Sequence, residues 1–426
     1  MDPLKLLVAT LFCLTYVLVV IFYHKKAYFA WFTAFVFLIV GVLKFSNVPS
    51  IINWNVIGIY VGMLFISEAF IVSKVPDYLA ILFTNKTSKV WSALLFICFF
   101  SGIISIFLEN VAVVLIVAPI AFSIAKRIKI NPVPLLIGIA VSSNLQGVAT
   151  LIGDPPSMIL GGFAKLTFND FFLYQGKPGL FWCVQIAAIA SLFVLWFIFR
   201  KLKQPLGTIP QIRITSITPS LLIILLVLLL AVSSFFENGF SYTVGIICML
   251  FGMASLFWIW FTEKKGVVER IKAMDWETAF FLMAIFLLVE GLVSVGLIDD
   301  LGNFIFSLTG TNVFLAFNLI IWMSVFFSAF VDNVPYIVTM LPVVDHIASG
   351  FNLPHVRTLF LFGLVLAASV GGNITPVGAS ANIVALGQLK NKGYHVNFWQ
   401  FVRIGLPFTI VSVGVAELLL WFIWMY

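Results

Sequence analysis

The chain reads SIFLENV at residues 105–111 and, 223 residues later, SAFVDNV at residues 328–334. Each copy places an acidic residue and an asparagine in the middle of an apolar stretch of about 35 residues, over 90–125 and 312–347. Such a stretch either crosses a bilayer twice or forms a re-entrant hairpin, because one helical crossing takes about 20 residues. Both alternatives give an even number of crossings.

Other landmarks recur in the same order at nearly the same offset. Asn53-Trp54 matches Asp275-Trp276, Glu68 matches Glu290, Pro119 matches Pro342, and TLIGD (150–154) matches TPVGA (375–379). Five expected crossings separate Trp54 from Trp276, and an odd number gives the two copies opposite orientations. Inverted repeats are typical of secondary transporters that bind substrate near the bilayer midplane. We expect N-terminal helices (1–50), a first repeat (51–201), connecting helices (202–272) and a second repeat (273–426).

The composition indicates an all-α protein that crosses a membrane many times. Hydrophobic residues make up 62% of the 426 residues and charged residues only 10%, which does not suit a soluble domain. In a bilayer, helices satisfy all backbone polar groups, except where a break lines a protected cavity. The net charge of +7 arises from short loops, so it indicates topology and no nucleic-acid partner.

We expect ten crossings, two of them broken, at 133–164 and 357–388. The others are expected near 4–23, 27–44, 54–75, 179–200, 217–235, 240–262, 275–298 and 401–425. With the His24-Lys25-Lys26 loop in the cytoplasm, 19 Lys and Arg residues lie inside and 5 outside, as the positive-inside rule requires. Both termini are then outside, and we expect the protein in the cell (inner) membrane.

The sequence offers no signature of an enzyme. Four cysteines (Cys13, Cys98, Cys183 and Cys248) lie in apolar runs without paired spacing, so we expect buried thiols rather than disulfides or a zinc site. No paired-histidine motif and no Gly-Lys-Ser/Thr phosphate loop is present. We therefore expect no catalysis and no cofactor, although the chain could serve as the membrane subunit of a pump with a separate ATPase partner.

The first candidate site element is the acid-asparagine tip, Glu109-Asn110 and Asp332-Asn333. A carboxylate at the centre of a membrane costs about 2.5–3.5 kcal/mol on insertion scales, so it needs a partner or a purpose. No basic residue lies inside any apolar run. A structural salt bridge is therefore disfavoured, and we expect these carboxylates to serve transport.

The second element is a pair of polar, glycine-rich breaks at 142–157 and 371–382. Glycine permits unwound backbone, and Pro155-Pro156 after Asp154 predicts a new helix with Asp154 as its N-cap. The alternative, that the glycines only allow close helix packing, suits Gly58 and Gly62 better. Free carbonyls with Thr, Ser and Asn side chains suit sodium, whereas helix dipole ends suit an anionic or polar substrate.

Thirteen residues at the tips and breaks form the predicted binding site. They are Glu109, Asn110, Asn144, Thr150, Gly153, Asp154, Asp332, Asn333, Asn373, Thr375, Gly378, Ser380 and Asn382. Among them, Asn110, Thr150, Asn333 and Thr375 are the predicted sodium ligands. Glu68 and Glu290 lie deep in their helices, and for them a proton path and a structural ion pair remain equal alternatives.

At these tips and breaks the sequence resembles the ion transporter superfamily, in particular the branch of the melanosomal P protein and the arsenite-permease-like carriers (citrate transporter-like domain). The resemblance covers the chain from about residue 50. It implies a homodimer, a fixed scaffold that includes the N-terminal helices (1–50), a moving transport domain with re-entrant hairpins at 90–125 and 312–347, and an elevator-like mechanism. Members of the superfamily move arsenite, silicic acid, sodium against protons, or di- and tricarboxylates. The carboxylate carriers have Ser-Asn-Thr at the tips, whereas this chain has Glu109 and Asp332.

Two acidic tips would repel a multiply charged anion in a low dielectric, so dicarboxylates rank low as substrates. An acidic group in such surroundings can hold a proton in one state and release it when a cation arrives. We therefore expect a proton- or sodium-coupled antiporter that carries sodium or a neutral oxyacid such as arsenite, with Glu109, Asp154 and Asp332 as exchanging groups. A sodium-coupled carboxylate symporter and an ion channel remain alternatives.

Overall fold

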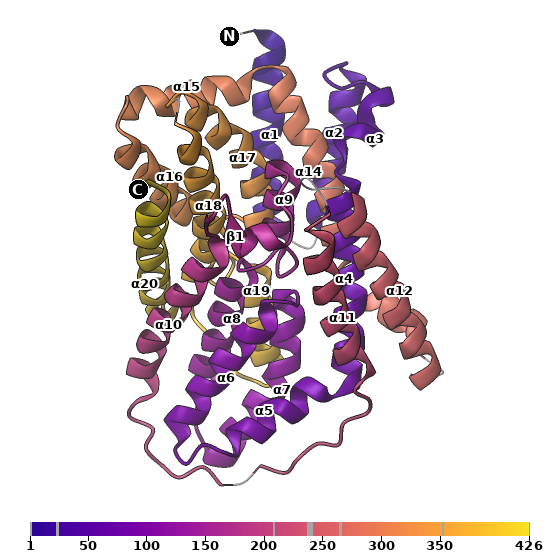
Figure 1. Cartoon of the computed structure of the whole chain (residues 1–426), viewed down its shortest axis with the longest axis vertical. Helices are drawn as coiled ribbons and strands as arrows, with labels where there is room; N and C mark the ends of the chain where they lie inside the picture. Colours follow the sequence, from indigo (N-terminus) through magenta and orange to yellow (C-terminus); the bar gives the residue numbers. More distant parts are fainter. Residues whose placement is uncertain are drawn as a thin grey trace.

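The structure is a computed structural model that describes residues 2–22, 25–207, 209–236, 242–263, 266–351 and 353–425. His24, Lys264 and Lys265, which belong to loops expected in the cytoplasm, lie outside these ranges. The described chain is a bundle of helices with one short hairpin, in which β1 (Leu173–Tyr174) pairs antiparallel with β2 (Lys177–Pro178) (Figure 1). The all-α membrane class is confirmed.

Two series of helices match one another in order. The first is α4 (Trp54–Ser73), α5 (Val75–Thr84), α6 (Val90–Ser105), α7 (Asn110–Ile128), α8 (Val133–Gly147), α9 (Pro155–Ala164) and α10 (Leu180–Phe199). The second is α14 (Trp276–Ser294), α15 (Leu297–Thr309), α16 (Val313–Ser328), α17 (Asn333–Ser349), α18 (Pro354–Gly371), α19 (Ser380–Asn391) and α20 (Phe398–Met425). The hairpin α6–α7 enters from the lower end of the molecule and α16–α17 from the upper end, as inverted copies require (Figure 1).

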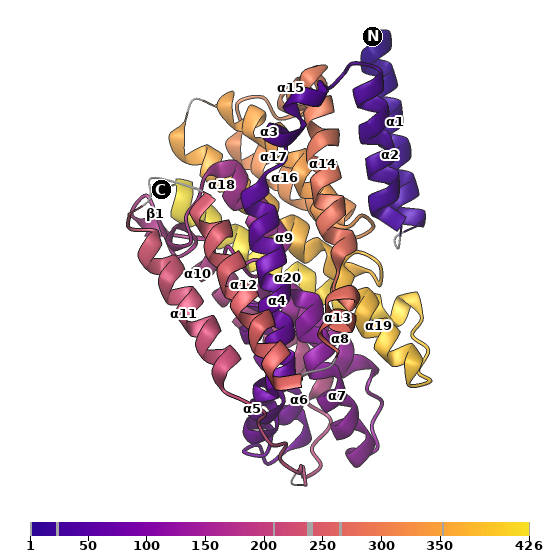
Figure 2. The same ribbon diagram turned by 90° about the vertical axis from the view of Figure 1, so that its right-hand side faces the viewer.

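The remaining helices precede the two series. They are α1 (Pro3–Ile21), α2 (Lys26–Ile39), η2 (Phe45–Asn47) and α3 (Val48–Ile51) before the first, and α11 (Thr218–Ser233), α12 (Tyr242–Glu263) and α13 (Val267–Ala273) before the second. The short 3-10 turns η3 (Asn169–Phe171) and η4 (Gly372–Ile374) lie within the copies. Helices α1 and α2 lie side by side along the upper half of the molecule, at its edge (Figure 2).

Equivalent helices of the two copies begin with equivalent N-caps. Asn53 accepts a hydrogen bond from the amide of Val56 at 3.2 Å and Asp275 accepts one from Thr278 at 3.0 Å, at the starts of α4 and α14. Glu109 and Asp332 cap α7 and α17 in the same way. A side-chain oxygen at this position satisfies one of the free N–H groups of the first turn. The sequence landmarks shared by the repeats are therefore largely helix starts.

Eight helices in the described residues are long and apolar enough to cross a membrane. Seven of the ten expected crossings coincide with them, whereas α2 and α11 have only 14 and 16 residues and 133–164 is divided between α8 and α9. The total of ten stays a prediction. Helices α5, α13 and α15 were not expected, because each is a short segment of 7 to 13 residues.

Close packing of α4 against α12 follows from small residues, as predicted for Gly58 and Gly62. A Cβ on Gly62 would lie 2.4 Å from the carbonyl oxygen of Cys248, and one on Gly58 would lie 3.3 Å from Gly245. The backbones of the two helices therefore approach each other closely, as small residues in membrane helices allow.

The cysteines were predicted to be buried thiols. Cys98, Cys183 and Cys248 are buried, but the prediction is wrong for Cys13, which lies exposed on the outer helix α1.

Candidate ion-binding site

The turns of the two inverted hairpins and the breaks of the two interrupted helices meet at one small cavity. Its volume is about 30 Å³, which exceeds the roughly 10–15 Å³ of cavity volume that one water molecule needs. It is lined by Lys26, Tyr60, Glu109, Asn110, Asn144, Asp154, Pro155, Pro156, Asp275, Thr278, Asp332, Asn333, Val334, Ala379, Ser380 and Ala381. The cavity is therefore large enough for a single small ion.

The two acidic tips have different surroundings. The Glu109 carboxylate accepts a hydrogen bond from the amide of Ala112 at 3.1 Å and forms no ion pair among the described residues. The Asp332 carboxylate accepts from the amide of Val334 at 3.3 Å and also forms an ion pair with Lys26, with 3.0 Å between Nζ and Oδ2. The expectation that no basic residue reaches the tips is therefore wrong for Asp332.

Lys26 reaches Asp332 because its side chain is turned into the molecule at the start of α2. Its side chain is 2% exposed and lies 5.3 Å from the centre of the Phe281 ring. The sequence placed it in a basic loop, next to Lys25, which is indeed exposed. An ion pair between residues 306 positions apart leaves no local signal, so only the folded chain reveals it.

In the first repeat, oxygen atoms of the hairpin turn and of the break face one another. The side-chain oxygen of Asn110 accepts a hydrogen bond from the Ser105 hydroxyl at 2.7 Å, and the Thr150 hydroxyl donates to the carbonyl of Ile106 at 2.5 Å. Gly153 lies so close to the turn that a Cβ there would be 2.9 Å from the Ser105 carbonyl and 3.0 Å from that of Ile106. Carbonyl, amide and hydroxyl oxygens gathered in this way suit a hard cation.

The second repeat builds the same arrangement. Asn333 Oδ1 accepts from the Ser328 hydroxyl at 2.8 Å, and the Thr375 hydroxyl donates to the carbonyl of Ala329. Gly378 approaches the hairpin turn, since a Cβ there would lie 2.8 Å from the Ala329 carbonyl. The four predicted sodium ligands thus fall into two symmetry-related groups.

Asparagines join the two repeats behind the cavity. Asn144 Nδ2 donates to Asn373 Oδ1 at 2.8 Å and to Asn382 Oδ1 at 3.1 Å. Asn382 Nδ2 in turn donates to the carbonyls of Gly372 at 2.9 Å and Thr375 at 3.0 Å, across the second break. All three side chains are almost completely buried. This network fixes the two unwound segments relative to each other.

Asp154 caps α9 as predicted, with Oδ1 accepting from the amide of Ser157 at 3.0 Å. Its other oxygen, Oδ2, is buried without a hydrogen bond of ordinary geometry among the described residues, although the Ser369 side chain is near enough to interact. The equivalent position in the second repeat is Ala379, which leaves α19 without a side-chain cap. The acid at this break therefore belongs to one repeat only.

The predicted residues separate into two groups. Glu109, Asn110, Asn144, Asp154, Asp332, Asn333 and Ser380 line the cavity, whereas Thr150, Gly153, Asn373, Thr375, Gly378 and Asn382 do not line it. Among the polar lining residues, sequence reasoning missed four, namely Lys26, Tyr60, Asp275 and Thr278. Asp275 was recognised only as a repeat landmark; its Oδ2 accepts hydrogen bonds from Thr278 Oγ1 at 2.6 Å and the Tyr60 hydroxyl at 3.4 Å.

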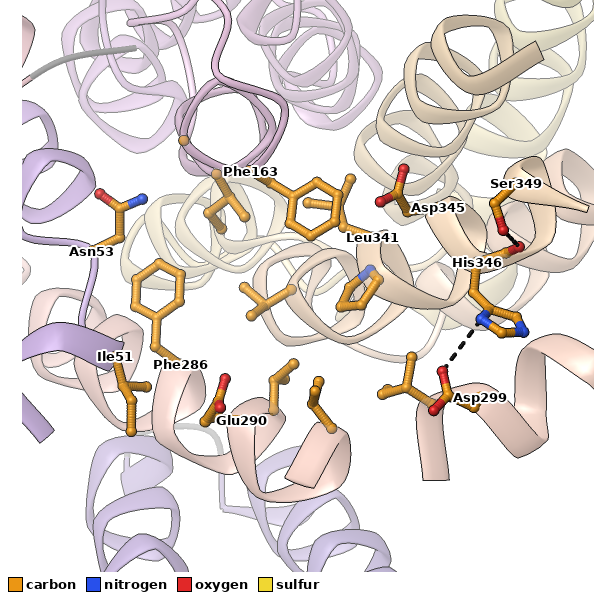
Figure 3. A pocket seen from close by; sticks show the side chains of 17 residues that line it. Ile51, Asn53, Phe163, Phe286, Glu290, Asp299, Leu341, Asp345, His346 and Ser349 are labelled. Carbon is orange, nitrogen blue, oxygen red and sulfur yellow. Dashed lines mark hydrogen bonds and ion pairs between the residues drawn. The ribbon is translucent and has the colours of Figure 1, made fainter. Parts of the chain in front are cut away.

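Two larger cavities are related by the repeat symmetry. The first, of about 690 Å³, lies between α9, α14 and α17 and contains Asn53, Glu290 and His346, whose Nδ1 lies 3.2 Å from a carboxylate oxygen of Asp299 (Figure 3). The second, of about 550 Å³, lies between α4, α7 and α19 and contains Asp275 and Glu68. We call them the upper and lower vestibules.

Only the lower vestibule adjoins the small cavity. The two share Lys26, Glu109, Asp275, Thr278 and Ser380, whereas the upper vestibule and the small cavity share no lining residue. The lower vestibule also contains Lys272 from the side with excess basic residues. At its rim Glu68 pairs with Arg270 at 2.5 Å, which favours the structural alternative for this glutamate.

Comparison with known proteins gives matches along most of the chain. A family model described as citrate transporter matches residues 16–357. An uncharacterized transporter of Mycobacterium tuberculosis is 30% identical over 377 residues, covering 87% of this chain and 86% of that protein. The P protein of Homo sapiens is 24% identical over 455 residues, covering 88% of this chain and 54% of that protein. The resemblance to the P protein branch is confirmed.

Solved structures of membrane transporters share the fold. The YdaH transporter of Alcanivorax borkumensis superposes with a TM-score of 0.60 and 13% identity, covering 89% of this chain and 88% of that chain. MtrF of Neisseria gonorrhoeae, from a class of antimetabolite efflux pumps, gives a TM-score of 0.55 with 14% identity over 91% of this chain and 83% of that chain. These identities establish the architecture alone.

Proposed function

Because the chain belongs to the citrate transporter family, and is thus a multi-pass membrane transporter, we propose that it exchanges protons or sodium for a small inorganic ion. One observation carries the proposal: two acidic hairpin tips from opposite ends of the molecule meet two helix breaks at a cavity of about 30 Å³. Four carboxylates, from Glu109, Asp154, Asp275 and Asp332, and one buried amine, from Lys26, line it. Such a cluster favours binding of protons and small cations.

The coupling ion fits the two oxygen groups beside this cavity. The group around Asn110 and Thr150 and the group around Asn333 and Thr375 each combine side-chain and carbonyl oxygens of a hairpin turn and a break. If the hairpin moves relative to the break, each group loses part of its oxygen set. A cation held there would therefore stabilise one arrangement of the hairpin, which is how ion binding drives a conformational equilibrium.

The transport mechanism we propose is alternating access of the elevator type. The small cavity shares lining residues with the lower vestibule and none with the upper one. In inverted-repeat transporters the second state arises when the two copies exchange conformations, so the cavity would then adjoin the upper vestibule. The close α4–α12 pair belongs to the fixed scaffold, and the hairpins with α8, α9, α18 and α19 form the moving domain. We also propose a homodimer in the cell membrane with both termini outside.

Sodium fits the small acidic cavity better than an organic acid, and a neutral oxyacid such as arsenite carries no negative charge for the carboxylates to repel. The family description and the amine of Lys26 nevertheless favour a second candidate, a carboxylate bound at the border of the lower vestibule. That vestibule has about 550 Å³, which exceeds the lower limit of about 300 Å³ for small-molecule pockets. The substrate experiment therefore includes citrate.

The experiment is uptake into proteoliposomes that contain a pH-sensitive dye, with sodium, arsenite or citrate added outside and no ATP. Glu109→Gln is compared with the wild type, and Glu269→Gln, at an exposed position on α13, is the matched control. Sodium-driven proton release that is absent only in Glu109→Gln supports cation/proton antiport. Arsenite flux without a sodium response assigns the oxyacid, and citrate flux assigns the second candidate. No flux of any kind without ATP contradicts secondary transport.

A further inference from the structure

The two halves of the small cavity differ in charge although the repeats place the same chemistry at both tips. Asp332 forms an ion pair with Lys26 at 3.0 Å, and the amine and the carboxylate are 2% and 7% exposed. The Glu109 carboxylate, at the equivalent tip, accepts a hydrogen bond from the amide of Ala112 and forms no ion pair within the described ranges. One tip is thus neutralised by a residue of the chain and the other is not.

The partner of Asp332 lies outside both repeats. Lys26 is the first residue of α2, in the N-terminal helices that precede the first copy. The same helices hold the second hairpin at another point, because the Tyr16 hydroxyl donates to the carbonyl of Pro335 at 2.5 Å and hydrogen-bonds Thr339 Oγ1 at 2.8 Å. The amine is therefore held against the tip of the second hairpin by the packing of α1 and α2.

We propose that Lys26 acts as a tethered cation that occupies the second-repeat half of the site, so that only the Glu109 half exchanges a proton or cation in each cycle. This proposal rests on the proposed transport function and sets its stoichiometry. A buried ammonium 3.0 Å from the Asp332 carboxylate already offsets its negative charge. A second cation at the same carboxylate would therefore gain little electrostatic attraction.

The other charged groups around the tips fit this assignment. Asp154 and Asp275 line the same cavity and are acidic, so without Lys26 the cavity would contain four carboxylates and no cation among its described lining residues. Like charges at this spacing favour uptake of protons or cations. Lys26 lowers by one the number of cations that the cluster takes up.

The test is the coupling ratio in proteoliposomes, measured from the membrane potential at which an imposed ion gradient gives no net flux. Lys26→Met is expected to raise the number of protons or sodium ions moved per substrate by one. Lys26→Arg keeps the charge and is expected to keep the wild-type ratio. Lys25→Met, an exposed neighbour in the same segment, is the matched control and is expected to change nothing.

Lys26→Met leaves a buried carboxylate unpaired and so is the variant at risk of misfolding. The double variant with Asp332→Asn removes both charges and is expected to fold; its flux falls, because two site residues are changed, but the number of cations moved per substrate stays that of the wild type. An unchanged ratio in folded Lys26→Met, or a changed ratio in the neutral double variant, would overturn the tethered-cation role.

A binding measurement separates this inference from the transport proposal. Sodium or acidic pH is expected to protect Lys26→Met in detergent against thermal unfolding more strongly than the wild type, whether or not the liposomes show flux. Wild-type liposomes without any coupled flux would refute the transport proposal. Equal protection of both proteins would refute the role of Lys26.

Discussion

Substitution of Gly153 by alanine tests whether the first break really packs against the hairpin turn. The new Cβ would lie 2.3 Å from the Gly147 carbonyl oxygen, 2.9 Å from that of Ser105 and 3.0 Å from that of Ile106. All three are backbone atoms, so no side chain can rotate away. To restore an ordinary contact of about 3.4 Å, the shortest distance must grow by about 1.1 Å.

Overpacking of this kind costs about 1–3 kcal/mol in a well-packed interior. Here the strained atoms belong to the oxygen group that includes Thr150, so we expect the upper part of that range and loss of ion-dependent stabilisation. A loss of about 2 kcal/mol changes the ratio of folded to unfolded protein by up to about 30-fold. Gly414→Ala in α20 is the control, because a Cβ there meets no atom within 4 Å and alanine favours helix by up to about 1 kcal/mol.

Thermal unfolding in detergent can be followed with a thiol-reactive dye. Cys98, Cys183 and Cys248 are buried and react only after unfolding, whereas exposed Cys13 sets the baseline. We expect a lower unfolding temperature for Gly153→Ala, no decrease for Gly414→Ala, and no sodium-dependent shift in Gly153→Ala. Wild-type stability together with a wild-type sodium response would refute the close approach of turn and break.

Three further substitutions probe the surrounding structure. Asn144→Ala removes two hydrogen bonds between the repeats and should lower the free energy of unfolding by about 2–4 kcal/mol. A double-mutant cycle with Asn373→Ala should give an interaction energy between the two side chains above about 0.5 kcal/mol. Arg270→Gln should cost less than about 1 kcal/mol, with a smaller effect in high salt, because its ion pairs are about one-third exposed. Gly62→Ala should lower the unfolding temperature more than Gly58→Ala, since their Cβ contacts would be 2.4 Å and 3.3 Å; equal effects would contradict the packing of α4 on α12.

The sequence predicts the parts of this architecture that repeat. Acid-asparagine pairs mark the starts of α7 and α17, and the prolines after Asp154 mark the start of α9, because N-caps and proline have strong local preferences. Helices such as α5 and α15 escape prediction, because segments of 10 and 13 residues are too short to stand out in an apolar chain.

Contacts between distant segments could not be predicted. Because Lys26 follows another lysine, Lys25, it looked like part of an exposed basic loop. Nothing local indicates that α2 begins beside Asp332. Asp275 was recognisable only as the equivalent of Asn53, and its place in the cavity follows from the crossing of α14 with the hairpin tips. Packing of the N-terminal helices on the second hairpin and of one repeat on the other decides these contacts.

Side-specific labelling of a single cysteine tests the central claim most directly. Ser380 lines both the small cavity and the lower vestibule, so Ser380→Cys in a chain without the four natural cysteines reports access to the site. In liposomes of known orientation, we expect a membrane-impermeant thiol reagent to label Ser380→Cys from the side of α7 and α13, and the transported ion to protect it. We expect access from the opposite side only after a change of conformation. Simultaneous access from both sides, as in a channel, or labelling that no transported ion prevents, would contradict this central claim.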